Sequence, residues 1–229
     1  ITVAKTLEKK IIGKKITEAK VYYDNVIVGD KEEFISKIKD EKIESITTRG
    51  KWIIIYLTNY ALLTHLRMEG RFYFRKKGDS LSKHEHVSLL LDDNIEMRFH
   101  DVRKFGRMIL LPKYEVLNIK PLSDLGYEFN DPRLTEEYLL TKFKNKSTPI
   151  KTVLLDQSII AGIGNIYDDE ILFKSGISPM RRGCDISRNE CLTIINNTKI
   201  ILSEAVKLGG TTIKSFTSSE GVHGLFQAK

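Results

Sequence analysis

The 229-residue sequence predicts an α+β protein, with an N-terminal antiparallel β-sandwich domain followed by a C-terminal helical domain. Three observations lead to this prediction. Apolar and polar residues alternate along the first half of the chain, turn-prone sequences separate the alternating stretches, and helical spacing replaces the alternation in the second half. Many short strands joined by tight turns are typical of a sandwich or a barrel. We therefore predict a sandwich domain over residues 1–115, a linker over 116–132 and a helical domain over 133–229.

The sandwich domain is predicted to open with a helix over Thr2–Ile11, where apolar residues recur at helical spacing and lysines occupy the other face. From Ile16 the period becomes two and β-branched and aromatic residues dominate, so we expect strands from there on. The predicted strands are Ile43–Thr48, Trp52–Leu57, Ala61–Leu66, Arg71–Arg75, Val87–Leu91, Ile95–Phe99 and Met108–Leu111. Turn-prone sequences between them are Thr58-Asn59, Lys77-Gly78-Asp79 and Asp92-Asp93-Asn94.

The C-terminal domain follows a stretch, Pro112–Pro132, that holds three of the five prolines and is typical of an interdomain linker. Beyond this stretch the spacing of apolar residues predicts only helices, which leaves room for a groove between the two domains. The predicted helices are Thr135–Phe143, Lys151–Gln157, Gly164–Lys174 and Arg188–Lys207.

The chain carries 37 Lys and Arg against 30 Asp and Glu, which gives a net charge of +7 and a pI of about 9.2. This excess is compatible with nucleic acid, an anionic membrane or acidic ligands and does not select among them. No run of 18 apolar residues occurs, so we expect no membrane-spanning helix. Cys184 and Cys191 are too far apart for a CxxC pair and lack a neighbouring His at ligand spacing. They therefore indicate thiols in a reducing cytoplasm and not a zinc site.

The segment Leu154–Pro179 is typical of two helices joined by a tight turn. Gly162 and Gly164 lie just before Asn165 and let the backbone approach a partner closely. A helix that starts at Asn165 points unpaired N–H groups at this partner, and the Asn side chain adds a donor for a phosphate oxygen. The alternative is a glycine-broken helical hairpin that packs only on itself.

Two clusters in the sandwich domain combine basic residues with predicted turns. In Arg49-Gly50-Lys51, the lysine is either an exposed hairpin residue or a phosphate contact. In His65–Arg71, Met68 stands between arginines and before Glu69-Gly70, which is a poor context for a core residue. Methionine is a flexible apolar side chain that suits the hole left when a base leaves the stack. A strand end that tucks Met68 inward is the alternative.

A third cluster, Asp101–Arg107, places Arg103 and Phe105 two residues apart, so both side chains project together from an extended or looped backbone. A guanidinium can hydrogen-bond an orphaned base while a phenyl ring wedges into the neighbouring base step. A basic loop with a core Phe is the alternative. A further run of lysines has no carboxylate beside it and fits either a solvated helix face or phosphate contacts. Its members are Lys142, Lys144, Lys146 and Lys151.

These motifs together resemble the formamidopyrimidine-DNA glycosylase and endonuclease VIII family, and are most similar to formamidopyrimidine-DNA glycosylase. The matching motifs are a helix-two-turn-helix with Gly-Asn-Ile-Tyr at Gly164–Tyr167, Leu-Arg-Met-Glu-Gly at Leu66–Gly70 and Asp-Val-Arg-Lys-Phe-Gly at Asp101–Gly106. The resemblance implies a bacterial, cytoplasmic, monomeric base excision repair enzyme that acts on damaged double-stranded DNA and not at a membrane. It would flip oxidised purines (8-oxoguanine, formamidopyrimidines) out of the duplex, cleave the N-glycosidic bond through a Schiff base and nick the strand by β,δ-elimination.

The resemblance also implies roles for individual residues. DNA phosphates would be bound by Lys51, His65 and Asn165, with Lys51 in a supporting catalytic role near the reacting sugar. The place of the flipped nucleotide would be filled by Met68, Arg103 and Phe105. The lesion pocket would include Glu69, Lys151, and Thr211 and Lys214 of the glycine-rich loop Gly209–Gln227. His84-Glu85-His86 matches a family stretch that binds no metal, and we expect none there.

The sequence departs from the family pattern at both ends. The family's proline nucleophile and glutamate acid lie in a Pro-Glu-Leu-Pro-Glu start that precedes the part matched by Ile1–Leu7. Phe226-Gln227 matches the family's approach to a zinc finger, so we expect zinc in the full-length protein and no zinc ligand in these residues. We interpret the sequence as part of a complete enzyme.

Two alternatives stay open. One is an endonuclease VIII-like glycosylase for oxidised pyrimidines, and the other is a catalytically silent damaged-DNA binding protein whose chain starts at Ile1. The complete void-filling set and the long loop at Gly209–Gln227 favour the purine branch of the family.

Overall fold

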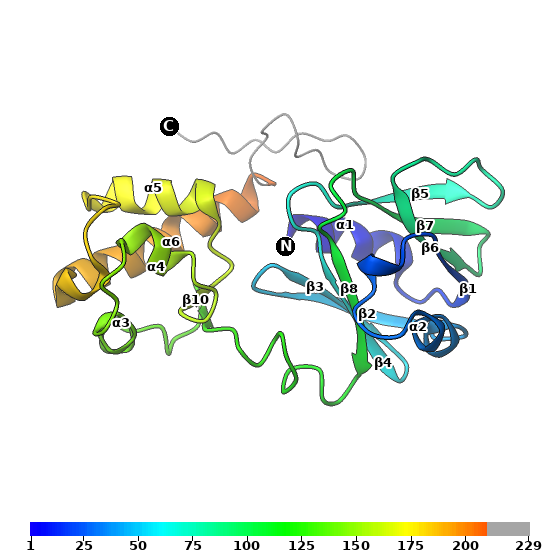
Figure 1. Cartoon of the computed structure of the whole chain (residues 1–229), viewed down its shortest axis with the longest axis horizontal. Helices are drawn as coiled ribbons and strands as arrows, with labels where there is room; N and C mark the ends of the chain where they lie inside the picture. Colours follow the sequence, from blue (N-terminus) through cyan, green and yellow to red (C-terminus); the bar gives the residue numbers. More distant parts are fainter. Residues whose placement is uncertain (210–229) are drawn as a thin grey trace. The chain divides into compact units, whose positions relative to one another are not determined.

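The computed structural model of the chain describes residues 1–209, which divide into two compact units, residues 1–119 and residues 120–209. The first unit contains two antiparallel sheets, and the second is built mainly of helices (Figure 1). This architecture confirms the predicted α+β fold class with its N-terminal β-sandwich. The domain bounds 1–115, 116–132 and 133–229 stay a prediction.

Each sheet of the first unit has four strands, and neighbouring strands within a sheet run antiparallel. The order in one sheet is β1 (Ile16–Val21), β6 (Glu85–Leu91), β7 (Ile95–His100) and β5 (Arg71–Lys76). The order in the other is β2 (Ile43–Arg49), β3 (Trp52–Leu57), β4 (Tyr60–His65) and β8 (Arg107–Pro112). The chain therefore crosses between the sheets where β1 leads to β2, where β4 leads to β5 and where β7 leads to β8.

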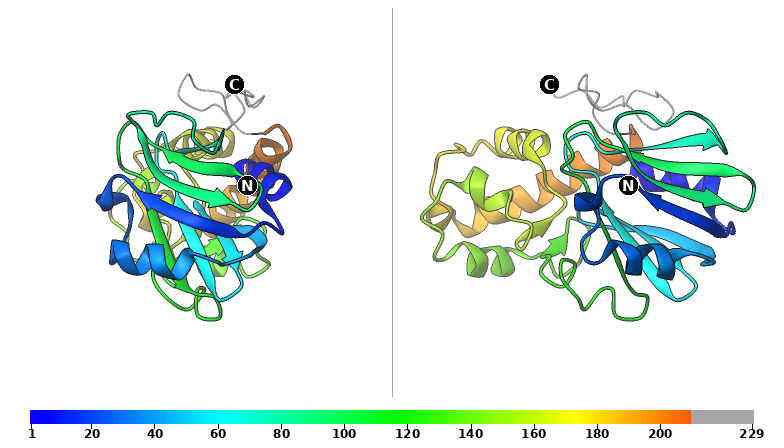
Figure 2. Two further views of the ribbon diagram at one scale, coloured as in Figure 1. Left: turned by 90° about the vertical axis from the view of Figure 1, so that its right-hand side faces the viewer. Right: turned by 45° about the vertical axis from the view of Figure 1, so that its right-hand side comes forward.

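One hydrophobic core includes residues from both sheets and fixes which face of each strand points inward. Ile53 and Ile55 of β3 and Leu89 and Leu91 of β6 belong to it, as expected for residues two apart on a strand. Helix α1 (Thr2–Ile11), which was predicted with these bounds, packs against β2 and buries Ala4, Leu7 and Ile11. It is the dark-blue helix next to the N-terminus in Figure 2. Full burial of one such aliphatic side chain stabilises a fold by about 2 kcal/mol.

A short helix interrupts the strand pattern between β1 and β2, and the prediction of strands throughout this stretch is wrong here. Helix α2 (Lys31–Ile38) begins after Asp30, whose carboxylate accepts the N–H of Glu33 at 2.7 Å. Its buried Phe34 faces the core, and the helix packs against β1. A 3-10 turn, η1 (Asp24–Val26), precedes it.

Helices surround a separate core in the second unit. They are α3 (Glu136–Phe143), α4 (Ile150–Leu154), α5 (Asn165–Ser175) and α6 (Arg188–Lys207), with a 3-10 turn, η2 (Gly183–Asp185), before α6. The prediction of helices only is wrong, because β9 (Tyr127–Glu128) and β10 (Ile160–Ala161) pair in parallel. Across residues 1–209, no helix is both long and apolar enough to cross a membrane.

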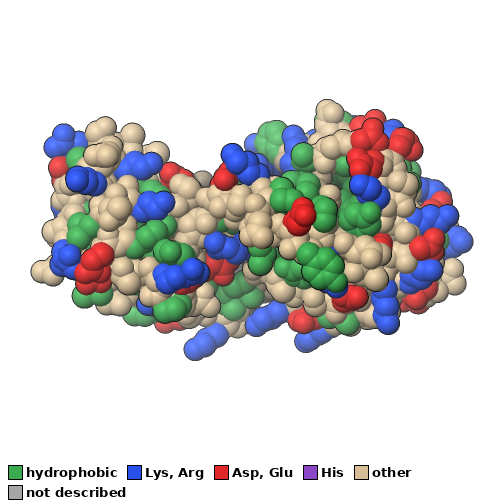
Figure 3. All heavy atoms as spheres, turned by 90° about the horizontal axis from the view of Figure 1, so that it is seen from below, with side chains coloured by type: hydrophobic (Ala, Val, Ile, Leu, Met, Phe, Trp, Pro, Cys, Tyr) green, Lys and Arg blue, Asp and Glu red, His purple; other side chains and the backbone are tan. Residues whose placement is uncertain are grey.

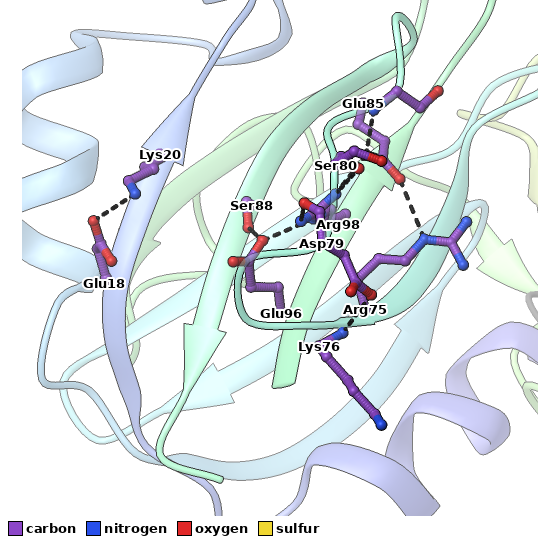
Figure 4. A network of polar contacts seen from close by, with 11 residues as sticks. Glu18, Lys20, Arg75, Lys76, Asp79, Ser80, Glu85, Ser88, Glu96 and Arg98 are labelled. Atoms are coloured by element: carbon purple, nitrogen blue, oxygen red, sulfur yellow. Dashed lines mark hydrogen bonds and ion pairs between the residues drawn. The ribbon is translucent and has the colours of Figure 1, made fainter. Parts of the chain in front are cut away.

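A buried ion network fixes the start of β6 on its sheet. Arg98 of β7 donates from Nη1 to Glu85 at 2.9 Å and from Nε to Glu96 at 2.7 Å (Figure 4). The same guanidinium donates to two carbonyl oxygens of the β5–β6 connection, at 2.7 and 3.0 Å. Burial by itself raises the pKa of the Glu85 carboxyl, but hydrogen bonds from the Ser82 N–H and Arg98 outweigh it and hold that pKa below its usual value. The buried charges thus have the partners that make such a network stable.

Candidate nucleic-acid interface

Two loops cross between the sheets at the same end of the sandwich. The Met68 loop (residues 66–70) joins β4 to β5, and the Phe105 loop (residues 101–106) joins β7 to β8. His65, at the end of β4, pairs with Arg107, at the start of β8. The first residue of β5 likewise pairs with the last residue of β7. Since each loop leaves and enters on paired strands, the two loops lie side by side.

A single buried ring supports both loops. Phe99 of β7 is fully buried and contacts Phe72 edge-on, with 5.6 Å between the ring centroids. A Cβ atom on Gly70 would lie 2.5 Å from the carbonyl oxygen of Leu66 and 3.0 Å from the far end of the Phe99 ring, and one on Gly106 would overlap that ring. Glycine is therefore required at Gly106 because the backbone closes onto the Phe99 ring, and at Gly70 mainly because the loop closes onto its own Leu66 carbonyl.

The Met68 loop is a tight turn that presents its methionine outward. The N–H of Gly70 donates to the carbonyl of Leu66 at 2.9 Å, and Arg67 adopts a left-handed backbone with φ of +54°. The N–H of Arg67 donates to Nδ1 of His65 at 3.0 Å, which holds this unusual backbone in place. Met68 is 51% exposed, so the alternative in which it tucks into the core is wrong.

The Phe105 loop presents an arginine and an aromatic ring together. Phe105 is 48% exposed, so the alternative of a core Phe is wrong. The guanidinium carbon of Arg103 lies 4.8 Å from the centre of the Phe105 ring, so the two side chains do project together as predicted. Beneath them, the buried carboxylate of Asp101 accepts the N–H of Arg103 at 3.0 Å and the N–H of Gly106 at 2.7 Å.

His65 and Lys51 place a neutral donor and a cation at the same end of the second sheet. Lys51 is exposed in the two-residue turn between β2 and β3, where Gly50 takes a φ of +57°. Trp52, the next residue, pairs with His65 and meets its ring edge-on at 4.9 Å between centroids. Burial, together with the charges of Arg67 and Lys51, lowers the pKa of His65 to about 4, so the ring is neutral near pH 7. Because Nδ1 accepts a hydrogen bond, Nε2 carries the proton and can donate to an anion.

Asn165 is the first residue of α5 and is exposed. The loop before it is organised by Gln157, whose side chain donates to the carbonyls of Leu155 at 2.9 Å and Ile163 at 3.0 Å and accepts the N–H of Gly162 at 2.9 Å. The start of an 11-residue helix collects unpaired N–H groups, and it can bind an anion.

The sequence-based expectation for the two helices around this loop is partly correct. The predicted start and end of α5 are confirmed within one residue, with Gly176 left-handed at the C-cap (φ of +66°). The predicted extension of α4 to Gln157 is wrong, since α4 ends at Leu154 and Gln157 bonds the loop instead. The role of Gln157 leaves no local signal in the sequence, because its partners lie both before and after it.

The lysine run, which has no carboxylate beside it in the sequence, gains carboxylate partners from elsewhere in the fold. Lys146 pairs with Asp156 at 3.3 Å, and Lys151 on α4 pairs with Asp169 on α5 at 2.5 Å. The hydrogen bond to Asp169 raises the pKa of Lys151. On the face drawn in Figure 3, basic side chains are spread over both units with hydrophobic ones among them.

The residues predicted to line a lesion pocket are only partly described. Glu69 is half-buried within the Met68 loop. Thr211 and Lys214 lie outside the described residues.

Residues 1–209 offer no cluster of three or more His, Cys, Asp or Glu side chains arranged to hold a metal ion. In the His84-Glu85-His86 stretch, Nε2 of His86 instead donates to the carbonyl of Asp101 at 2.7 Å. Cys191 is buried in the helical core and Cys184 is exposed. The described residues therefore do not fit a zinc site.

Comparison with known proteins gives matches over nearly the whole chain. Models of the formamidopyrimidine-DNA glycosylase N-terminal domain and H2TH domain match residues 1–108 and 125–217. Formamidopyrimidine-DNA glycosylase of Bacillus cereus is 43% identical over 227 residues, covering 98% of this chain and 82% of that protein.

Two solved structures from Lactococcus lactis show the same fold. A mutant of that organism's Fpg in complex with a Fapy-dG containing DNA has a TM-score of 0.90 and 29% identity, covering 97% of this chain and 82% of that one. The wild-type Lactococcus lactis Fpg (MutM) in complex with an oxidized pyrimidine containing DNA has a TM-score of 0.86 and 30% identity, covering 92% and 79%.

Proposed function

The chain belongs to the formamidopyrimidine-DNA glycosylase family, and we propose that it acts in base excision repair by removing oxidised purines from double-stranded DNA. The observation that carries this proposal is the exposed pair of loops that present Met68, Arg103 and Phe105 beside Lys51 and His65. Met68 and Phe105 expose apolar side chains on two adjacent loops beside basic groups, an arrangement that suits a binding surface.

Binding of the DNA backbone is assigned to groups that can hold phosphate without reading sequence. The ammonium of Lys51 supplies charge, and Nε2–H of His65 supplies a directed neutral donor. Asn165 adds its amide to the N–H groups at the start of α5. These contacts predict an affinity that falls steeply as the salt concentration rises.

Eversion of the damaged nucleotide is assigned to the two loops. Flipping a base costs a few kcal/mol of lost stacking and pairing, and an apolar side chain in the vacated space offsets part of that cost. Met68 has the exposure and flexibility to fill the space. Arg103 can hydrogen-bond the orphaned base while Phe105 enters the adjacent step. Glu69, Lys151, Thr211 and Lys214 are proposed to line the pocket for the everted base.

The chemical step requires an amine that attacks the anomeric carbon and a carboxylic acid that moves protons. In this proposal the full-length gene product supplies both from an N-terminal Pro-Glu. Departure of the base then leaves a Schiff base, from which β,δ-elimination nicks the strand. The part of Lys51 is to hold the phosphate next to the reacting sugar. Zinc in a finger of the full-length protein would have a structural role, and no step depends on it.

Borohydride trapping of the full-length gene product on abasic-site DNA tests the chemical step. Reduction should convert the Schiff base into a stable protein–DNA conjugate that is visible as a slower band in a denaturing gel. The absence of such a conjugate, with binding to the same DNA intact, would leave the damaged-DNA binding protein as the function.

Oxidised pyrimidines are a second substrate class, favoured by the solved complex of the Lactococcus lactis relative with an oxidized pyrimidine containing DNA. Single-turnover excision from matched duplexes that carry 8-oxoguanine or an oxidised pyrimidine distinguishes the two classes. We expect faster excision of the purine, and the reverse order would assign the chain to the pyrimidine-preferring function.

A further inference from the structure

We propose that Asp101 is a positioning residue, whose buried carboxylate aims Arg103 and Phe105 and thereby sets how well the protein distinguishes damaged from intact DNA. This inference rests on the proposed function of the Phe105 loop. In this proposal Asp101 does not contact DNA. It acts only through the Phe105 loop, which contacts DNA.

The carboxylate of Asp101 bridges the two ends of the loop. Asp101 is 0% exposed, and its two oxygens accept separate backbone donors, the N–H of Arg103 at 3.0 Å and the N–H of Gly106 at 2.7 Å. Between these donors lie only Lys104 and Phe105. Hydrogen bonds to a charged acceptor are among the strongest that proteins form, so this bridge fixes the path of the exposed residues.

The backbone of Asp101 is itself fixed to β6. Its N–H donates to the carbonyl of His84 at 2.9 Å, and its carbonyl accepts Nε2–H of His86 at 2.7 Å. Glu85, between these histidines, belongs to the buried network of Arg98 drawn in Figure 4. The loop is therefore anchored through Asp101 to the part of the sheet that carries this buried network.

The loop has further main-chain contacts: the N–H of Lys104 donates to the carbonyl of Asp101 at 3.3 Å, and Nη1 of Arg107 donates to the carbonyl of Gly106 at 2.8 Å. The contacts of its exposed side chains are weaker. The guanidinium of Arg103 lies over the Phe105 ring, and the ammonium of Lys104 lies 4.5 Å from the centre of the Tyr23 ring. Exposed cation–π contacts of this kind contribute about 0.5–1 kcal/mol each. Lys104 also holds a left-handed backbone with φ of +60°, which costs energy in a non-glycine residue. The buried carboxylate is thus the side chain that ties Arg103 to Gly106, and it acts together with the packing of Gly106 on Phe99.

The ordered loop serves binding more than it serves folding. Phe105 is about half exposed, so ordering it adds little to the core. A side chain that is ordered before it meets its target avoids the entropy cost of ordering on binding. Because this gain appears only when the loop enters DNA, loss of the carboxylate should affect damaged-DNA binding beyond its effect on stability.

The test compares Asp101→Asn with wild type in binding two duplexes of one sequence, one intact and one carrying a tetrahydrofuran abasic-site analogue. Asparagine offers one acceptor where the carboxylate offers two, and its NH₂ group then faces an N–H donor. We expect the ratio of the two affinities to fall about tenfold, which corresponds to the loss of one charged hydrogen bond. A 2-aminopurine placed opposite the abasic site should also lose the fluorescence change that Phe105 causes.

A matched control is Glu41→Gln at the opposite end of β4. Glu41 is also buried, and its carboxylate accepts two donors of Asn59, the backbone N–H and the side-chain Nδ2–H, both at 2.7 Å. This substitution removes the same kind of bond far from the loops. It should lower the melting temperature and leave the affinity ratio unchanged. A fall in the ratio equal to that of Asp101→Asn would show a general loss of structure and overturn the inference.

A double-mutant cycle separates this inference from the proposed function. On an Arg103→Ala, Phe105→Ala background, Asp101→Asn should change the ratio by less than about twofold, because the residues through which it acts are gone. If Arg103→Ala, Phe105→Ala itself leaves the ratio unchanged, the proposed function of the loop fails. If that background lowers the ratio and Asp101→Asn does not, only the positioning role fails. Asp101→Ser, which retains one weaker acceptor, is judged by the same criteria if the Asn variant does not fold.

Discussion

The Phe105 loop and the start of α5 present their candidate DNA contacts by different physical means. In the loop, the direction of Arg103 and Phe105 depends on one buried carboxylate and on one glycine that closes onto a ring. At the helix, Asn165 is placed by a regular ladder of main-chain hydrogen bonds. In the helix many main-chain hydrogen bonds hold the conformation, whereas in the loop a few contacts hold it. Single substitutions should therefore have larger effects in the loops than at the helix.

The largest effect is expected from Gly106→Ala. Its new Cβ atom would overlap the ring of Phe99, which is fully buried and packs edge-on against Phe72. We expect the free energy of unfolding to fall by roughly 3 kcal/mol in urea titrations, as for overpacking of a core. Gly176→Ala at the end of α5 is the helical counterpart, with a left-handed φ of +66° and open space around it. It should lose only about 1 kcal/mol. If both substitutions lowered the free energy of unfolding equally, the loop would be no more sensitive to a single substitution than the helix.

An intermediate effect is expected from pH at His65. The pKa of His65 is about 4 in the folded protein against an ordinary value of 6.5, so between these values the unfolded chain binds a proton that the folded chain does not. Stability that is present above pH 6.5 is therefore lost as the pH falls toward 4. Allowing for partial exposure of the ring, the loss is on the order of 2 kcal/mol.

Two variants separate the charge of His65 from its hydrogen bond. Both His65→Asn and His65→Gln should abolish this share of the pH dependence in urea titrations at pH 7 and pH 4.5. The side-chain oxygen of asparagine can take the position of Nδ1 and accept the N–H of Arg67. Glutamine is one methylene longer, so its oxygen does not reach that position. The Asn variant should therefore be the more stable of the two near pH 7. If the wild type loses no more stability between pH 7 and pH 4.5 than the two variants lose, the assignment of this pH dependence to His65 is wrong.

The smallest effect is expected from Asn165→Ala. The backbone N–H groups at the start of α5 remain, and the N-cap of the helix, Gly164, is unchanged by the substitution. Affinity for intact and abasic-site duplexes should fall together by about fivefold, since phosphate contacts position DNA without recognising the lesion. Fluorescence anisotropy at fixed salt measures both. A loss confined to the abasic-site duplex would place Asn165 with the lesion contacts instead.

The sequence predicted the sandwich well because burial on one face imposes a period of two. β3 was predicted with its observed bounds, and the other predicted strands lie within a few residues of theirs. Helix α2 was missed because it buries few side chains, although Asp30 followed by Glu33 is a capping signal that could have revealed it. The pairing of β9 with β10 joins two residues to two others far along the chain, and no local pattern encodes it.

The sequence predicted which side chains form the candidate site, but it did not predict which residues hold those side chains in place. Motif resemblance singled out Met68, Arg103 and Phe105, and exposure of the Met and Phe agrees with a role at the surface. The part played by Asp101 depends on distances between atoms, although an Asp two residues before a loop donor is a known turn signal. The joint use of Phe99 by two loops can be recognised only in three dimensions.

The support that Phe99 gives to both loops determines what could be transplanted into another protein. Grafting the Phe105 loop alone onto a different sandwich would leave Gly106 without the Phe99 ring on which it packs, and a grafted Met68 loop would keep only the contact of Gly70 with its own Leu66 carbonyl. A working graft needs the ring from β7 and one glycine from each loop, three positions that are scattered along the sequence. The structural unit at this end of the protein is thus a set of residues that meet only in the fold. A linear motif transferred by itself would lack the side chain on which it packs.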